Sequence, residues 1–297
     1  ALFKVVALRN KCRELNIEKI ETGDKGVLIG FYKDTFANPD GLLHYILAHP
    51  GVMSLRADQK VLWHRRWPDG VSRLQAIERL LEEFKDLAHR CRDANFQLCT
   101  HAIGDRGNRM VLDVYSETLK DRKNHRWRIE HAQMVSDEDI PRFAKTGIIP
   151  SMQPSHCTSD MPWLHDRLGS ERLHRISRWQ SFINAGCQIP GGSDCPIEEG
   201  NPIFEYYAAV TRQNHQGMPK GGWQKQEAVS RLNALKMFTT WAAYGEFAEH
   251  RRGKIRPGFD ADLTILSQDI LCCTTDEILS TEILGTMVGG NLIYSKL

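Results

Sequence analysis

The sequence predicts an α/β fold, with βα units on a parallel sheet followed by a small β module. Two observations predict this fold. From Ser72 onward, short apolar strands alternate with amphipathic helices at least four times, which is typical of βα units on a parallel sheet. After about residue 250 the pattern changes to two strands with no helix between them.

The predicted elements follow one another regularly along the chain. A helix begins after Ser72, with apolar residues at spacings of three and four, and stops near Asn95. We expect strands over residues 96–102, 126–132, 148–153 and 187–193, and helices from Gly104, from Ser136, and over 170–184, 202–212 and 227–244. The last strands are expected over 262–266 and 283–294, the second one broken at Gly289-Gly290.

Length and composition set the limits of the interpretation. The 297 residues are enough for one large domain or two modest ones. A net charge of +2 gives no electrostatic case for a nucleic-acid or membrane partner, and no apolar run approaches the ~20 residues of a membrane span. Eight scattered cysteines are typical of reduced thiols, so we expect a cytoplasmic protein.

Three of the predicted strands end in residues that bind metals. These residues are His101, His131 and Asp194. Parallel barrels place their active sites at the carboxyl ends of the strands, and two imidazoles with a carboxylate suit zinc or a similar divalent ion. A single histidine at a strand end is more often structural, but three such positions on separate strands favour a metal site.

Several segments around these residues match one family in order along the chain. The segments are HAIGDRGN from His101, RIEHAQ from Arg128, SMQPSH from Ser151, GSDCPIE from Gly192 and GKIRPGFDADL from Gly253. Together they resemble the C-terminal portion of amidohydrolase family three, the YtcJ-like branch of the amidohydrolase superfamily. The resemblance covers the chain from about Ser72 to its end.

The resemblance implies a partial TIM barrel of the metal-dependent hydrolase type with part of a small β-sandwich module, and a role for each residue. Its domains would be a divergent or truncated segment (1–70), a barrel portion (71–250) and a β-sandwich remnant (251–297). His101 and His131 would be the metal ligands of the fifth and sixth strands, and Asp194 a ligand and general base at the eighth. In the family a metal-bound hydroxide attacks a carbonyl carbon, and the aspartate moves the proton to the leaving nitrogen. We therefore expect zinc as cofactor, a small-molecule substrate, and hydrolysis of a non-peptide carbon–nitrogen bond, either a linear or a cyclic amide.

Four further residues in these segments are candidates for substrate binding. They are Gln153, His156, Asp105 and Arg106. Three of them have a simpler interpretation: Asp105 and Arg106 could only cap a helix and hold its loop, and His156 could face solvent.

The N-terminal part departs from the family pattern. No His-x-His occurs in the chain, and the residues around Lys33 do not match the lysine that many members use to bridge two metals. Three interpretations stay open. The chain is a fragment of an active enzyme, a mononuclear variant in which His44, His49 or His64 stands in, or a catalytically inactive relative with a structural or partner-binding role. The last predicts a homo-oligomer that covers the exposed half of the barrel.

Overall fold

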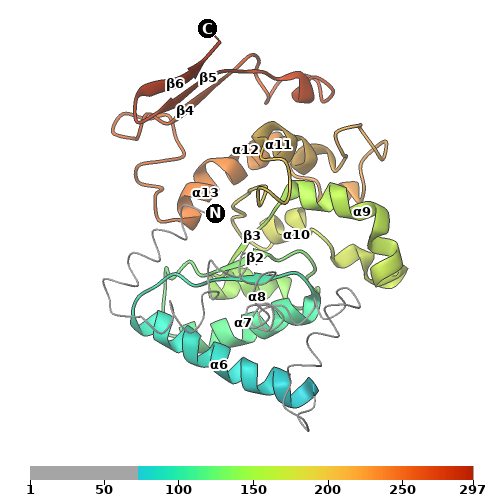
Figure 1. The fold of residues 1–297 in the computed structure, drawn as a ribbon, viewed down its shortest axis with the longest axis vertical. Coiled ribbons are helices and arrows are strands. Elements are labelled where there is room, and N and C mark those ends of the chain that lie inside the picture. Colours follow the sequence, from blue (N-terminus) through green and yellow to red (C-terminus); the bar gives the residue numbers. More distant parts are fainter. Residues whose placement is uncertain (1–72, 297) are drawn as a thin grey trace. The chain divides into compact units, whose positions relative to one another are not determined.

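The structure, a computed structural model, describes residues 73–296. These residues form an α/β arrangement of helices and short strands (Figure 1). They divide between two compact units, one that runs to Ile148 and one that starts at Ile149, and each is described by itself. Lys33, His44, His49, His64 and the segment 1–70 lie outside the described residues, and the boundaries expected at residues 70 and 250 stay predictions.

The first unit contains a parallel βαβ arrangement. Its elements are α6 (Arg73–Asp93), β1 (Cys99–Ala102), α7 (Asp105–Leu119), β2 (Arg128–His131) and α8 (Ile140–Thr146). Strands β1 and β2 pair in parallel, with Cys99 opposite Arg128 and Ala102 opposite His131. Helix α7 connects them, so the alternation that the sequence predicts is confirmed here.

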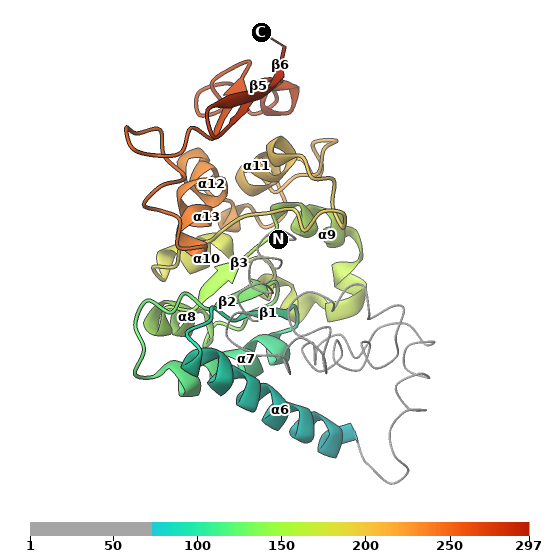
Figure 2. The same cartoon turned by 60° about the vertical axis from the view of Figure 1, so that its left-hand side comes forward.

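Helix α7 lies between the strand pair and α6, as both views of the ribbon show (Figures 1 and 2). Its buried face includes Val111, Leu112, Val114 and Leu119, at the spacing of one helical face. Tyr115 on this face is fully buried, and its hydroxyl lies 2.6 Å from the Thr100 hydroxyl of β1. The hydrogen bond joins the helix to the strand without leaving a buried polar group unsatisfied.

The ends of α6 and α8 test two predicted boundaries. Helix α6 ends at Asp93, close to the stop expected near Asn95: Asn95 has a left-handed φ of 57°, and the Phe96 amide donates to the Cys91 carbonyl at 2.8 Å. Helix α8 begins at Ile140, so the start predicted at Ser136 is wrong. The Ser136 hydroxyl donates to the Asp139 carboxylate at 3.0 Å and fixes a turn before the helix.

The second unit is mostly helical. Its helices are α9 (Pro154–Leu168), α10 (Trp179–Asn184), α11 (Pro202–Thr211), α12 (Arg231–Phe238) and α13 (Thr240–Gly245), with 3₁₀ turns at Ser170–Arg175, Lys225–Glu227 and Ile278–Ser280. Strand β3 (Ile149–Ser151) precedes them.

Three helix predictions in this unit need correction. Helix α9 was not expected, because Pro154 and Pro162 break the sequence pattern; Pro154 lies in the first turn, where a proline is tolerated. The helix predicted over 170–184 is a 3₁₀ turn followed by the short α10. The helix predicted over 227–244 divides at Thr239, whose φ and ψ of −125° and −94° are not helical.

The strand predicted over 187–193 is reduced to one bridge. Gly191 pairs in parallel with Met152. The Met152 amide donates to the Pro190 carbonyl at 3.0 Å, and the Gly192 amide donates to the Met152 carbonyl at 3.2 Å. Pro190 has no amide hydrogen, so it cannot extend the pairing, and the prediction of a regular strand is wrong.

The C-terminal strands form a three-stranded antiparallel sheet in the order β4 (Leu263–Leu266), β5 (Ile283–Val288), β6 (Asn291–Ser295). The break predicted at Gly289-Gly290 is confirmed: both residues have positive φ, 56° and 82°, as a tight hairpin turn requires. None of the described helices is long and apolar enough to cross a membrane. The seven cysteines within residues 73–296 are all free.

Candidate metal centre

His101 and His131 lie together at the carboxyl ends of two neighbouring strands. In the parallel register His101 is opposite Glu130, one residue from His131. The centroids of the two imidazole rings are 4.2 Å apart, with their planes inclined at 67°. His131 is buried, with 6% of its surface exposed. The structure therefore brings together two of the three residues that the sequence predicts as metal ligands.

The backbone turns sharply at His131. Its φ is 72°, and that of Ala132 is 41°, so two consecutive non-glycine residues are left-handed. Such conformations cost of the order of 1–3 kcal/mol each and persist only where the surroundings hold them. The turn returns the chain toward β1, where the Met134 amide donates to the Ile103 carbonyl at 2.8 Å.

Asp105 and Arg106 begin α7, directly after the loop that follows β1. The Arg106 amide donates to the Asp105 carboxylate at 2.9 Å, and an acidic group here suits the amino end of a helix. The Arg106 side chain is exposed. These contacts agree with a role in starting the helix, and the expected contact with substrate stays a prediction.

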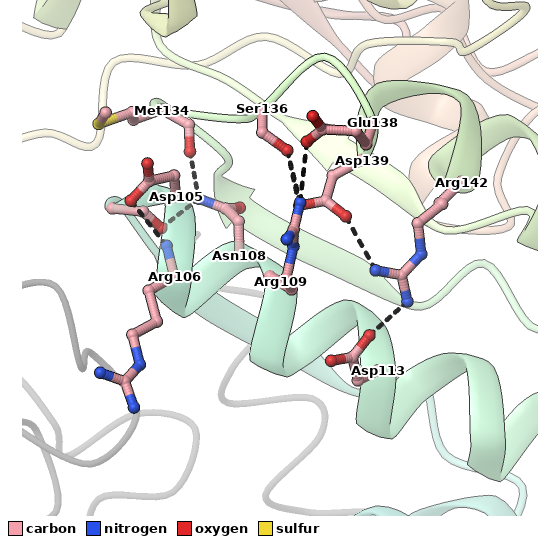
Figure 3. A network of polar contacts seen from close by, with 11 residues as sticks. Asp105, Arg106, Asn108, Arg109, Asp113, Met134, Ser136, Glu138, Asp139 and Arg142 are labelled. Atoms are coloured by element: carbon pink, nitrogen blue, oxygen red, sulfur yellow. Dashed lines mark hydrogen bonds and ion pairs between the residues drawn. The ribbon is translucent and has the colours of Figure 1, made fainter. Parts of the chain in front are cut away.

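A polar network holds the loop that follows β2 (Figure 3). Arg109 of α7 donates to Asp139 at 2.8 Å, to the Ser136 hydroxyl at 2.9 Å and to Glu138 at 3.0 Å. Arg142 of α8 donates to the other oxygen of Asp139 at 2.9 Å. Burial would raise the pKa of Asp139, but the hydrogen bonds from Arg109 and Arg142 outweigh it and hold that pKa below its usual value.

Asp194 belongs to the second unit, three residues after the Gly191–Met152 bridge. Its φ is 54°, a left-handed conformation that aspartate tolerates better than most residues. The Ile197 amide donates to the Asp194 carbonyl at 2.9 Å and closes a turn. Asp194 is half-buried on this turn rather than at the end of a regular strand.

Gln153 and His156 flank the start of α9. Gln153 precedes the helix, and His156 lies in its first turn. The His156 Nε2 is 3.9 Å from a carboxylate oxygen of Glu198, which also accepts a hydrogen bond from Ser159 at 2.6 Å. The side chain of His156 is only 13% exposed, so the alternative that it faces solvent is wrong.

Glu205 is a buried acid near this segment that the sequence reasoning missed. It lies on α11, is 1% exposed, and accepts a hydrogen bond from the Ser155 amide at 2.9 Å. Burial raises the pKa of Glu205 to about 7. The available signal was a single glutamate within the apolar run PIFEYYAAV, because an unpaired acid is rarely buried without a specific partner.

The donor set at the strand ends suits a divalent ion. Zinc takes imidazole nitrogens at roughly 2.0–2.1 Å, so two rings this close can each direct one nitrogen at the same ion. Within residues 73–296, no group of three or more histidine, cysteine, aspartate or glutamate side chains forms a complete metal site. His101 and His131 thus fit two positions of a coordination sphere.

A sequence profile of the amidohydrolase family matches residues 46–294. The match extends over more than half of the chain. The chain belongs to the amidohydrolase family. The resemblance drawn from the motifs around His101, His131 and Asp194 is therefore confirmed.

Two curated relatives set the extent of the similarity. The amidohydrolase-like protein YtcJ of Bacillus subtilis is 32% identical over 210 residues, which are 71% of this chain and 40% of YtcJ. The N-substituted formamide deformylase of Arthrobacter pascens is 28% identical over 217 residues, 72% of this chain and 39% of that enzyme. The chain thus spans about two fifths of the length of these relatives.

Solved structures agree with the family. An uncharacterized metal-dependent hydrolase from Pyrococcus horikoshii is 30% identical, with a TM-score of 0.58 over 66% of this chain and 38% of that one. A second, from Pyrococcus furiosus, is also 30% identical, with a TM-score of 0.55 over 64% of this chain and 37% of that one. Metal-dependent hydrolases are therefore this chain's structural relatives.

Proposed function

We propose that this chain is the C-terminal part of a metal-dependent hydrolase that cleaves a non-peptide carbon–nitrogen bond in a small-molecule amide or cyclic amide. The observation that carries the proposal is the pair of imidazoles, with centroids 4.2 Å apart, at the ends of two parallel strands. The expected fold of the whole is a (β/α) barrel with a β-sandwich module. The parallel β1–α7–β2 unit and the antiparallel β4–β5–β6 sheet support that expectation.

The substrate class rests on a relative. The deformylase of Arthrobacter pascens acts, by its name, on N-substituted formamides, which contain a carbon–nitrogen amide bond outside a peptide. Because this chain spans only 39% of that enzyme, hydrolysis of such a bond is a proposal for this chain.

Each of the three candidate residues has a role in the proposed reaction. His101 and His131 would hold the ion, and the family resemblance implies that Asp194 is a further ligand as well as the general base. A bound zinc would polarise the carbonyl and lower the pKa of water. Asp194 takes the proton of the attacking water and passes it to the leaving nitrogen. A carbon–oxygen bond forms and the carbon–nitrogen bond breaks, so the products are a carboxylic acid and an amine.

The test measures hydrolysis of an N-alkylformamide and of a cyclic amide by the zinc-loaded chain, with formate or free amine as the product detected. Asp194→Asn keeps the shape of the side chain and removes the base, so kcat falls by about 10²–10⁴-fold, the usual contribution of acid–base catalysis. The matched control is Glu282→Gln, which changes an exposed acid of the C-terminal sheet region and leaves kcat unaltered.

Two results would contradict the proposal. If the zinc-loaded chain hydrolyses neither probe, the alternative of an inactive relative with a structural or partner-binding role replaces catalysis. If Asp194→Asn is as active as the unmodified chain, hydrolysis does not use Asp194 as its base.

A further inference from the structure

Asn108 joins the two loops that follow the histidine-bearing strands. It lies in the first turns of α7 and is fully buried. Its side-chain nitrogen lies among four carbonyl oxygens, those of Ala102 at 3.2 Å, Ile103 at 3.1 Å, Gly104 at 3.0 Å and Met134 at 3.1 Å. Figure 3 shows this amide group directed at Met134.

These carbonyls come from both sides of the site. Ala102, Ile103 and Gly104 follow His101 directly, and Met134 lies three residues after His131. An amide nitrogen carries two hydrogens, so the four oxygens share them. One buried side chain therefore ties the end of β1 to the chain that leaves β2.

The position of Met134 matters because of the turn at His131. Two consecutive left-handed residues, His131 and Ala132, direct the chain back toward β1. The bonds that retain this turn are the Met134 amide to the Ile103 carbonyl, at 2.8 Å, and Asn108 to the Met134 carbonyl, at 3.1 Å. Loss of the second bond leaves a buried carbonyl unsatisfied and removes a restraint on a strained backbone.

We infer that Asn108 is a positioning residue: by joining the Ala102–Gly104 carbonyls to Met134, it holds His131 against His101 in the geometry that binds a metal. This inference rests on the proposed function, because it concerns the same ion. Partners that orient metal ligands typically contribute 10–100-fold to metal affinity, which is the effect expected here.

The experiment is a double-mutant cycle on zinc affinity, measured in the full chain by competition with a chromophoric chelator. Asn108→Asp keeps the volume and removes the amide donors, and Asn108→Ala removes the whole amide group. Each raises the Kd for zinc about 10–100-fold. In a His131→Asn background the same changes have almost no effect, because Asn108 acts through His131.

A control variant and a second measurement distinguish the positioning role of Asn108 from a purely structural one. Tyr115→Phe removes other buried hydrogen bonds of α7, those of the Tyr115 hydroxyl with Thr100 and with the Arg128 carbonyl, without touching either loop. It leaves zinc affinity unchanged. Hydrogen exchange in metal-free protein reports directly on the link that Asn108 makes between the two loops. The Met134 amide loses protection from exchange in both Asn108 variants and keeps it in Tyr115→Phe.

The outcomes distinguish the inference from the proposed function. If the unmodified chain binds no zinc, the proposed function fails and the inference fails with it. If the unmodified chain binds zinc and the Asn108 variants bind it equally well, only the inference is overturned. The inference alone is also overturned if the Met134 amide stays protected from hydrogen exchange in the Asn108 variants. It is likewise overturned if these variants still lose zinc affinity in the His131→Asn background.

Discussion

The two units hold their candidate site residues in different ways. In the first, His101 and His131 lie on paired parallel strands, and the polar side chains of α7 fasten the loops beyond them. In the second, Asp194 follows a single bridge, and the unit buries charged side chains such as Glu205 and Arg212. We expect buried side-chain contacts to contribute more to stability where fewer backbone hydrogen bonds join the strands. Changes to those side chains should therefore lower the free energy of unfolding more in the second unit than in the first.

The largest expected effect is at Arg212. This residue is fully buried, donates to the carbonyls of Trp223 at 2.6 Å and Ser177 at 2.9 Å, and lies over the rings of Trp179 and Trp223. Arg212→Met fills most of the space but leaves both carbonyls unsatisfied. We expect the free energy of unfolding in urea to fall by about 3–5 kcal/mol.

The matched change in the first unit is Arg142→Met. Arg142 is partly exposed, and Asp139 keeps its bond to Arg109 when Arg142 is lost. A loss of only about 0.5–1 kcal/mol is expected. Equal losses for Arg142→Met and Arg212→Met would remove the contrast between the two units.

The next expected effect is at Glu205, where the contribution of the side chain to stability depends on pH. Its pKa in the folded protein, about 7, is above the ordinary value of 4.5, so the folded state binds the proton more tightly. Stability from this group is fully present below pH 4.5 and declines as pH rises to about 7. Glu205→Gln keeps an acceptor for the Ser155 amide and removes the titration.

Thermal and urea unfolding across pH 4 to 8 check this prediction. Relative to the unmodified protein, Glu205→Gln gains stability as pH rises, by up to about 3 kcal/mol at pH 8 for the shift of roughly two and a half pH units. A constant difference between the two proteins across this range contradicts the assignment of a raised pKa to Glu205.

Asp139 gives a smaller effect than Glu205, with the opposite dependence on pH. Its lowered pKa means that its stabilisation is present above the ordinary value of 3.8 and is lost as pH falls through the folded pKa. Asp139→Asn keeps the shape but weakens the bonds to Arg109 and Arg142, at a cost of about 1 kcal/mol at pH 7. The difference from the unmodified protein shrinks below pH 3.8; a difference that grows there would contradict the role of the two arginines.

The sequence predicts most where local patterns and tertiary contacts agree. The βαβ order of the first unit, the end of α6 near Asn95 and the hairpin at Gly289-Gly290 all follow from periodicity and from residues that favour left-handed backbone. It fails where prolines alter the pattern. Helix α9 is not predicted because it contains Pro154 and Pro162. The strand predicted over 187–193 is only one bridge because Pro190 cannot extend the pairing.

The candidate metal centre likewise contains residues that the sequence predicts and residues that it does not. His101 and His131 could be found, because their residue types and places at strand ends indicate metal chemistry. Asn108 and Glu205 could not be given roles, because their functions depend on carbonyls and amides from distant segments. No local pattern reports such contacts.

The central claim is that His101 and His131 hold one divalent ion, and its direct test is the zinc content of the purified chain by elemental analysis. His131→Asn removes the imidazole while asparagine tolerates the left-handed backbone, and His125→Gln changes a histidine of the same unit that contacts the Thr146 carbonyl instead. We predict about one zinc per chain in the unmodified protein and in His125→Gln, and its loss in folded His131→Asn. Zinc retained in full by His131→Asn, or absent from the unmodified chain, would contradict the claim.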